Sequence, residues 1–205
     1  MPTPPQRTQR ERVEESSRRL AEAAIELIAE NGYAFTTAKD IGLRAGYSRA
    51  LVTQRFGSKD ALLDFVLTQY YERRLIETNV SGSSGLQQVL APIDALRSFA
   101  AEEPQTLRAM FVLNFEAVHN TDVLRDRITL WIRRFREQLV TSVIEGQQDG
   151  SIRSDVVAEQ VSADVIALGI GHAYAWVVMP DDYDFESTLM RYRTEVAQWL
   201  EPQRH

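Results

Sequence analysis

The chain has 205 residues, of which 44% are hydrophobic and 25% are charged. This balance is ordinary for a folded globular protein and excludes collagen-like and disordered classes. The chain contains no cysteine and only three histidines, which excludes disulfides, thiol nucleophiles and cysteine-ligated metals. We therefore expect no cofactor and no metal site. The lack of cysteine also fits a reducing cytoplasm, where we expect the protein to act.

Charge is distributed unevenly along the chain. The net charge is −6 at pH 7, yet residues 1–60 carry ten basic and eight acidic side chains, against thirteen and twenty-one in the remainder. A mildly basic head on an acidic body is the asymmetry expected when one part of a protein meets phosphate and the rest does not.

Apolar residues recur at helical spacing almost everywhere, and strand signals are nearly absent, so we predict an all-α fold of about nine helices. The first helix ends at Asn31-Gly32, the second begins near Thr36 or Thr37, and the third follows Ser48. A long fourth helix follows Gly57-Ser58. Five further helices are predicted near residues 86–102, 105–119, 122–147, 155–179 and 185–200.

The longest apolar run extends from Val165 to Pro180 and is interrupted by His172. A helix that crosses a bilayer needs roughly 18–20 continuous apolar residues. We therefore interpret this run as a buried helix and expect no membrane partner.

The most informative segment runs from Thr36 to Lys59. Two short helices joined by a glycine turn form a helix-turn-helix, in which Ala45 is small enough to let the helices approach and Gly46 permits the sharp turn. The mini-core between these helices is predicted to comprise Ile41, Val52 and Phe56. The third helix then exposes side chains of the types that reach base edges or phosphates in DNA.

The order and spacing of several motifs in residues 12–70 resemble those of one family. Asn-Gly-Tyr, Thr-Thr, Asp-Ile, Arg-Ala-Gly-Tyr-Ser and Phe-Gly-Ser-Lys all fall in the register of the N-terminal DNA-binding domain of TetR-family bacterial repressors. The resemblance implies a helix-turn-helix domain over residues 1–58, whose residues 1–10 we expect to form a disordered arm. It also implies a C-terminal ligand-binding and dimerisation domain over residues 59–205.

The resemblance implies a set of DNA-contacting residues. Thr37 opens the second helix against phosphate, and Arg49 begins the recognition helix as the best candidate for base contact. The complete set is Thr37, Ser48, Arg49, Ala50, Thr53, Gln54, Arg55 and Lys59. The family usually carries a phosphate-binding tyrosine where this chain has Thr53, which is too short to reach as far. We infer that Arg55 partly replaces that contact.

The C-terminal half predicts a partner subunit. The helix near 155–179 is apolar nearly all round, so it must be buried on several sides, and one side is assigned to a second copy. The resemblance implies the same interface, because TetR-family proteins typically dimerise through their last two helices. A large core within a single chain would produce the same apolar pattern. The predicted interface comprises Val161, Leu168, His172, Ala175, Leu189, Tyr192 and Val196.

Aromatic residues interleaved with polar ones in the middle of the chain predict a site for an apolar or aromatic small-molecule effector. The predicted lining is Phe99, Phe111, Asn114, Phe115, Trp131, Phe135 and Tyr174. Aromatic residues at helical spacing are also what a plain core contains.

An enzyme needs an organised constellation of reactive groups. The sequence has no nucleophile-elbow or phosphate-loop spacing, and a single Glu116 and His119 pair lacks the further carboxylates of a helical metal site. We therefore predict a homodimeric repressor that binds a palindromic DNA operator and is released by a small molecule. The alternative is a dimeric small-molecule sensor that acts through protein partners and binds DNA weakly, which Thr53 supports.

Overall fold

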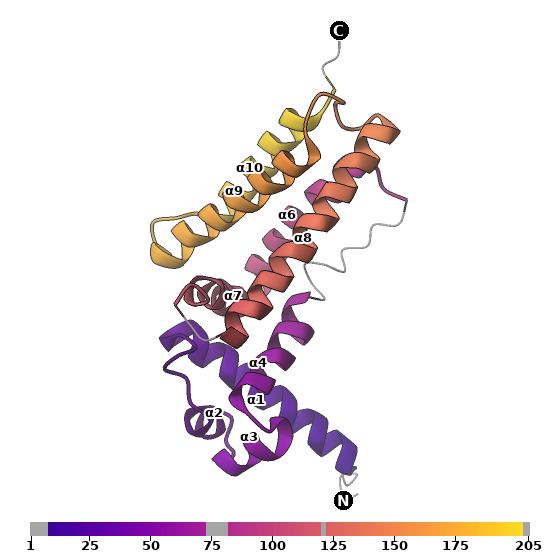
Figure 1. The fold of residues 1–205 in the computed structure, drawn as a ribbon. Helices are drawn as coiled ribbons and strands as arrows, with labels where there is room; N and C mark the ends of the chain where they lie inside the picture. The colour runs from indigo at the N-terminus through magenta and orange to yellow at the C-terminus, as the bar shows by residue number, and fades with distance from the viewer. Residues whose placement is uncertain (1–7, 73–81, 120–121, 203–205) are drawn as a thin grey trace, which may run out of the picture.

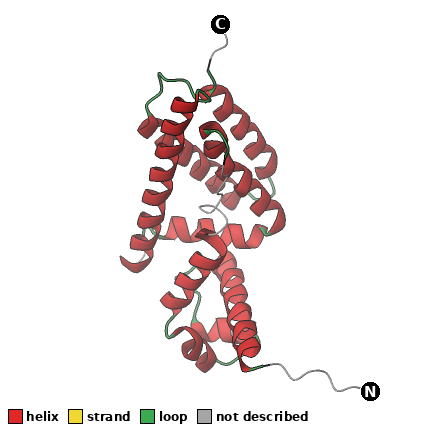
Figure 2. Ribbon diagram, turned by 90° about the vertical axis from the view of Figure 1, so that its right-hand side faces the viewer, coloured by secondary structure: helices red, strands yellow, loops and turns green. Residues whose placement is uncertain are grey.

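The computed structural model describes residues 8–72, 82–119 and 122–202, and these residues are all-α, as predicted. They form nine α-helices, one π-helical turn and no strand (Figures 1 and 2). The head consists of α1 (Gln9–Asn31), α2 (Ala38–Arg44), α3 (Arg49–Phe56), α4 (Lys59–Val66) and the π-helical turn η1 (Leu67–Glu72). The body consists of α6 (Gly85–Glu102), α7 (Pro104–Glu116), α8 (Asp122–Asp149), α9 (Ala158–Val178) and α10 (Phe185–Leu200).

The helices of the head begin at hydroxyl caps. A serine or threonine side chain at each start accepts a hydrogen bond from the backbone N–H three residues on, which satisfies a donor that has no partner inside the helix. These caps are Thr8, Thr37, Ser48 and Ser58. Because Thr8 caps α1, residues 9 and 10 are helical, and the predicted disorder of 1–10 is wrong at these two positions. Residues 1–7 lie outside the described residues.

Head and body are joined by helices that touch both. Within the head, α4 packs against α1 and α3, and it is tied to the body where Arg127 of α8 donates to Asp64 at 2.7 Å. In the body, α7 packs along α1. The predicted boundary between two domains after residue 58 stays a prediction, because α4 contacts helices of the head as well as a helix of the body.

The body is a bundle in which α6 packs against α8 and α10, and α8 also packs against α9. At the crossing of α6 and α8, Gly85 lies so close to the other helix that a Cβ would meet the backbone nitrogen of Gly146 at 2.1 Å. The Gly85 N–H donates to Asp149 at 2.8 Å. Gly85 therefore sets how closely α6 and α8 approach each other, and the arrangement of the helices in the body depends on that distance.

Gly85→Ala is expected to lower the free energy of unfolding by about 1–3 kcal/mol, because the new methyl group meets backbone atoms that cannot move aside as a side chain would. Chemical denaturation monitored by circular dichroism measures the loss. The control is Gln148→Ala, at an exposed position near the end of α8. Equal stability of the Gly85 variant and the parent protein would contradict the close approach.

Candidate DNA interface and effector cavity

The crossing of α2 and α3 is set by a glycine that sequence reasoning missed. A Cβ at Gly42 would lie 2.9 Å from the carbonyl carbon of Ser48, so the second helix approaches the start of the third at backbone distance. The expected features are also present: Ala45 is 5% exposed, and Gly46 has φ of 78°. The only sequence signal for Gly42 was a glycine within a predicted helix.

The third helix presents one buried and one exposed face. Val52 is 1% exposed and packs into the head together with Ile41, while the Ser48 hydroxyl accepts from the Leu51 N–H. The predicted DNA-contacting residues of this helix that are exposed are Ser48, Arg49, Ala50, Thr53 and Gln54. Leu51 and Phe56 also pack against the core, so this short helix is held on its apolar inner side and offers a mostly polar surface on the other.

Two predicted phosphate contacts are engaged within the head instead. The Arg55 Nε donates to the Ser16 hydroxyl on α1 at 2.9 Å. The Lys59 ammonium donates to the Tyr33 carbonyl at 2.9 Å and lies 3.9 Å from the centroid of the same tyrosine ring. Partial burial lowers the pKa of Lys59. Both side chains therefore hold α3 and α4 against the rest of the head, which differs from the free phosphate contacts we expected.

The loop between α1 and α2 is held by a carboxylate from the body. Glu116, the last residue of α7, accepts hydrogen bonds from the backbone N–H groups of Tyr33 at 2.9 Å and Ala34 at 3.2 Å. The Tyr33 ring is buried, and its hydroxyl donates to Asp60 on α4. Sequence reasoning assigned Glu116 no partner, because the groups it binds are backbone N–H groups more than eighty positions away.

A pocket that is partly open to solvent lies in the body, and the space within it is about 570 Å³ when the open solvent is included. Its walls are Pro92, Ile93 and Leu96 of α6, Met110 and Phe111 of α7, Trp131 and Phe135 of α8, Val165, Ile166, Gly169 and Ile170 of α9, and Tyr192 of α10. The Trp131 and Phe135 rings stack with centroids 5.5 Å apart. The Tyr192 hydroxyl donates to the Val165 carbonyl at 2.6 Å. None of these lining residues carries a charge.

Three of the seven predicted effector contacts line this cavity: Phe111, Trp131 and Phe135. Phe99 is instead part of a second cavity. Phe115 and Tyr174 pack against each other edge to face at 5.3 Å, and the Asn114 amide donates to the Met110 carbonyl. These four do not line this pocket, because helical spacing alone does not say toward which neighbour a side chain points, and the predicted set of effector contacts stays a prediction. Sequence reasoning did not predict the aliphatic residues that line this pocket, because their spacing along the helices is the same as that of ordinary core residues.

The predicted subunit interface stays a prediction, but the single chain shows how exposed each of its residues is. Four of its residues are at most 2% exposed within a single chain and cannot face a partner: Val161, Leu189, Tyr192 and Val196. Leu168 is 49% exposed, whereas His172 and Ala175 are half-buried. The His172 Nδ1 and the Tyr183 hydroxyl are hydrogen-bonded at 2.8 Å, and partial burial lowers the pKa of this histidine.

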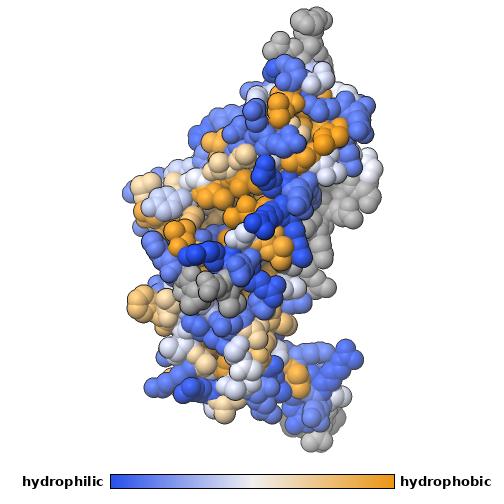
Figure 3. Space-filling model, viewed as in Figure 1, coloured by the Kyte–Doolittle hydropathy of each residue, from blue (hydrophilic) through white to orange (hydrophobic). Residues whose placement is uncertain are grey.

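Other apolar side chains of α9 and α10 are exposed in the single chain: Tyr174, Val178, Met190 and Trp199. Clusters of apolar side chains also lie on the body around α8 and α9 (Figure 3). Among the described residues, α9 is the helix long and apolar enough to cross a membrane, although only 22% of its most apolar window is buried. It carries the exposed Asp164 in its first third.

Two family models match the chain. The model of bacterial regulatory proteins of the tetR family matches residues 20–66, and that of the tetracycline-repressor-like C-terminal domain matches residues 85–190. The second match alone spans more than half of the sequence. The chain belongs to the TetR family. TetR-family proteins are DNA-binding transcriptional regulators rather than enzymes, are in general cytoplasmic, bind operators and small-molecule effectors, and are usually dimers.

Named TetR-family relatives are similar to this chain over most of its length. The transcriptional regulator BetI of Brucella suis biovar 1 (strain 1330) is 26% identical over 158 residues, covering 76% of this chain and 79% of BetI. The transcriptional repressor DhaR of Mycobacterium sp. (strain GP1) is 25% identical over 154 residues, covering 72% of this chain and 75% of DhaR.

Solved structures of the TetR family share the fold. A regulator from Chloroflexus aurantiacus J-10-FL superposes with a TM-score of 0.77 at 23% identity, covering 94% of this chain and 99% of the other. NalD of Pseudomonas aeruginosa, described as the secondary repressor of the MexAB-OprM multidrug efflux pump, gives a TM-score of 0.71 at 20% identity, with coverages of 93% and 100%. At such identities the likeness shows the fold alone.

The link between α7 and the head can be tested by Glu116→Ala. Because the variant leaves the N–H groups of Tyr33 and Ala34 without their charged acceptor, we expect the free energy of unfolding to fall by about 1–3 kcal/mol. Urea denaturation measures the change. Glu137→Ala removes the same atoms and charge from an exposed position on α8 and serves as the control. Losses of equal size in the two variants would mean that Glu116 contributes nothing beyond surface charge.

Proposed function

We propose that this TetR-family regulator binds a palindromic DNA operator as a homodimer and is released from it by a small-molecule effector. The observation that carries the proposal is the orientation of α3, whose Val52 side is buried while Arg49, Thr53 and Gln54 are exposed. Arginine and glutamine can form bidentate hydrogen bonds with guanine and adenine in the major groove. A helix fixed from behind is suited to presenting them there.

The remaining contacts with DNA are assigned to the ends of the helices. Thr37 and Ser48 are exposed caps of α2 and α3, and helix N-termini offer backbone N–H groups to phosphate. Ala50 lies on the exposed side of α3 and permits close approach of the helix to the groove. We assign Arg55 and Lys59 to positioning these elements, because each is bonded within the head.

Arg49→Ala is expected to weaken operator binding by about 1–3 kcal/mol and to relax the preference at one base position. Fluorescence anisotropy with duplexes taken from the DNA upstream of the protein's own gene, at several salt concentrations, measures both effects. Arg136→Ala, at an exposed position on α8 of the body, is the matched control. A uniform loss across all duplexes would reassign Arg49 to phosphate, and the absence of salt-dependent binding would refute the operator.

A homodimer accounts for the exposed apolar residues of α9 and α10. Contiguous apolar surface on a soluble protein marks an interaction site, and two heads on one face of DNA require half-sites about 34–36 Å apart. Leu168, Tyr174 and Val178 are each about half exposed, while Gly169 and Gly171 have open space where a Cβ would be. A second copy packed against this face would bury these residues and set the spacing of the heads.

Leu168→Glu is expected to convert the dimer to a monomer, because it places a charge in an apolar interface. Size-exclusion chromatography with light scattering measures the mass directly. Val118→Glu introduces the same charge at a residue that is 67% exposed at the end of α7, and this variant should remain dimeric. A Leu168→Glu protein that still elutes as a dimer would place the interface elsewhere.

The effector is proposed to be a neutral and largely apolar molecule. The pocket is lined by apolar and aromatic side chains without a charged group, and such a lining is typical of small-molecule sites. A buried charge without a partner would be strongly disfavoured in such an environment. Release follows if the effector binds better to the spacing of heads that does not fit the operator.

A further inference from the structure

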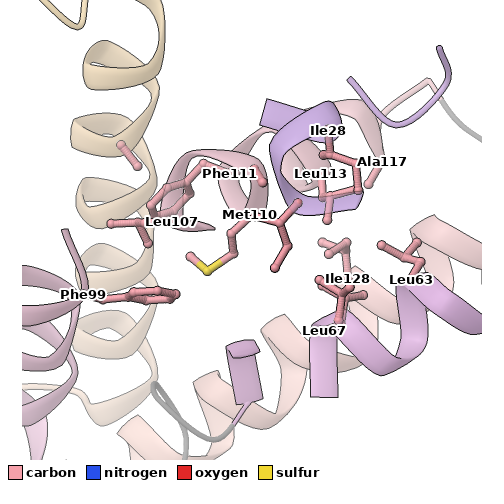
Figure 4. Packing of buried hydrophobic residues seen from close by; sticks show 14 of the residues in the cluster. Ile28, Leu63, Leu67, Phe99, Leu107, Met110, Phe111, Leu113, Ala117 and Ile128 are labelled. Carbon is pink, nitrogen blue, oxygen red and sulfur yellow. The ribbon is translucent and has the colours of Figure 1, made fainter. Parts of the chain in front are cut away.

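The lining of the effector cavity, which is the apolar pocket of the body, contains one hydroxyl group. Among the described residues that form its walls, Tyr192 supplies the one side-chain oxygen, whereas the indole of Trp131 is a hydrogen-bond donor only. On the α7 wall, Met110 and Phe111 lie among apolar side chains of the core, next to Leu107 (Figure 4). In small-molecule sites, a few fixed polar groups in an apolar lining decide orientation and specificity.

The Tyr192 hydroxyl is fixed in place and has already used its proton. It donates that proton to the Val165 carbonyl oxygen at 2.6 Å, and the side chain is 2% exposed. Burial raises the pKa of this phenol, so the hydroxyl keeps its proton at neutral pH. A hydroxyl has one proton to donate and two lone pairs that can accept. Toward a molecule in the pocket, Tyr192 can therefore act as an acceptor.

The backbone next to this hydroxyl is not covered by a side chain. Val165 and Gly169 both line the effector cavity from α9, and in an α-helix the Val165 carbonyl also accepts from the Gly169 N–H four residues on. A Cβ at Gly169 would have no neighbouring atom within 4 Å. The space over this turn of α9 is therefore open among the described residues. We call the Tyr192 hydroxyl and the Val165 carbonyl that it binds the polar spot.

We propose that Tyr192 determines the specificity of the effector cavity, and that the effector is an apolar molecule with one neutral hydrogen-bond donor, a hydroxyl or an N–H group. The effector donates to the Tyr192 hydroxyl, and Tyr192 donates to the Val165 carbonyl. This inference rests on the proposed effector site and names the chemical class of its ligand.

The polar spot selects against other ligands of the same shape. An ether, a ketone or a halide offers lone pairs alone, and these would face the lone pairs of Tyr192 without a proton between them. A charged donor such as an ammonium group is excluded because the lining has no carboxylate to pair with it. A neutral donor is favoured further because a hydroxyl that donates to one group accepts more strongly from another.

The probes for this proposal are p-cresol and 4-fluorotoluene, two rings of similar size of which the first has a hydrogen-bond donor and the second has none. Isothermal titration calorimetry measures the binding of each. Tyr192→Phe removes one oxygen atom and should weaken p-cresol by about three- to tenfold, because the hydroxyl of the ligand then lacks an acceptor. The same variant should bind 4-fluorotoluene at least as tightly as the parent protein does.

Tyr183→Phe is the matched control, because it also removes a hydrogen-bonded hydroxyl of the body, the one that binds His172, from a residue outside the pocket lining. It should leave the affinity for both probes unchanged. Gly169→Ala is the second variant. Its methyl group occupies the open space beside the polar spot and should also weaken p-cresol. Circular dichroism establishes that each variant is folded.

Three results would overturn the proposal. The first is equal affinity for p-cresol in the parent protein and in the folded Tyr192→Phe and Gly169→Ala variants. The second is a loss in Tyr192→Phe that is the same for both probes, because Tyr192 would then shape the pocket without accepting a hydrogen bond. The third is a parent protein that binds neither probe.

Calorimetry involves no DNA, so this inference and the proposed function can fail separately. Binding of p-cresol that depends on Tyr192, in a protein that binds no operator duplex in the anisotropy assay, would support the polar spot and contradict the proposed function. A protein that binds the operator and has the same affinity for p-cresol with and without the Tyr192 hydroxyl would contradict the polar spot and leave the proposed function standing.

Discussion

The packing of α1 against α7 is the constraint on which the rest of this structure depends. The first helix of the head and the second helix of the body share one apolar interface, to which α1 contributes Ile25 and Ile28 and α7 contributes Met110 and Leu113. At its end, α7 also supplies the Glu116 carboxylate to the loop that precedes α2. A helix that touches the effector cavity, the head and the turn before the DNA-facing helices cannot move without affecting all three.

The head itself is built to be rigid. Hydroxyl caps begin its helices, and Gly42 lets α2 reach the start of α3 at backbone distance. Arg55 donates a hydrogen bond to Ser16, and Lys59 donates one to the Tyr33 carbonyl. Because these cations are held inside the head, α3 keeps one orientation, which lowers the entropic cost of presenting its exposed face to DNA.

The body combines a close approach of two helices with an apolar pocket. Gly85 brings α6 and α8 to backbone contact at one end, while Pro92 of α6 and Trp131 of α8 both line the apolar pocket of the body. Empty apolar space weakens a fold because the lining atoms lack partners. Its retention in a protein of a ligand-responsive family fits a site that a neutral molecule completes.

The sequence by itself determined the helices, their caps and the family. Helical periodicity, Gly and Pro punctuation and the motifs from Thr36 to Lys59 are local signals, and local backbone chemistry acts over a few residues. The sequence alone could not decide which face of a helix packs against which neighbouring helix. Only tertiary packing placed Tyr192 inside the body rather than at a subunit interface, and turned Phe115 toward Tyr174 rather than toward the effector cavity.

The same reason explains what sequence reasoning missed. Glu116 bonds to backbone groups of Tyr33 and Ala34, which any residue could supply, so no side-chain pattern marks the partnership. Met110 has the spacing of any other apolar residue of its helix, and only the packing of the body shows that it lines the apolar pocket. Periodicity records that a side chain is buried, whereas the identity of its neighbours depends on contacts between residues far apart in the chain.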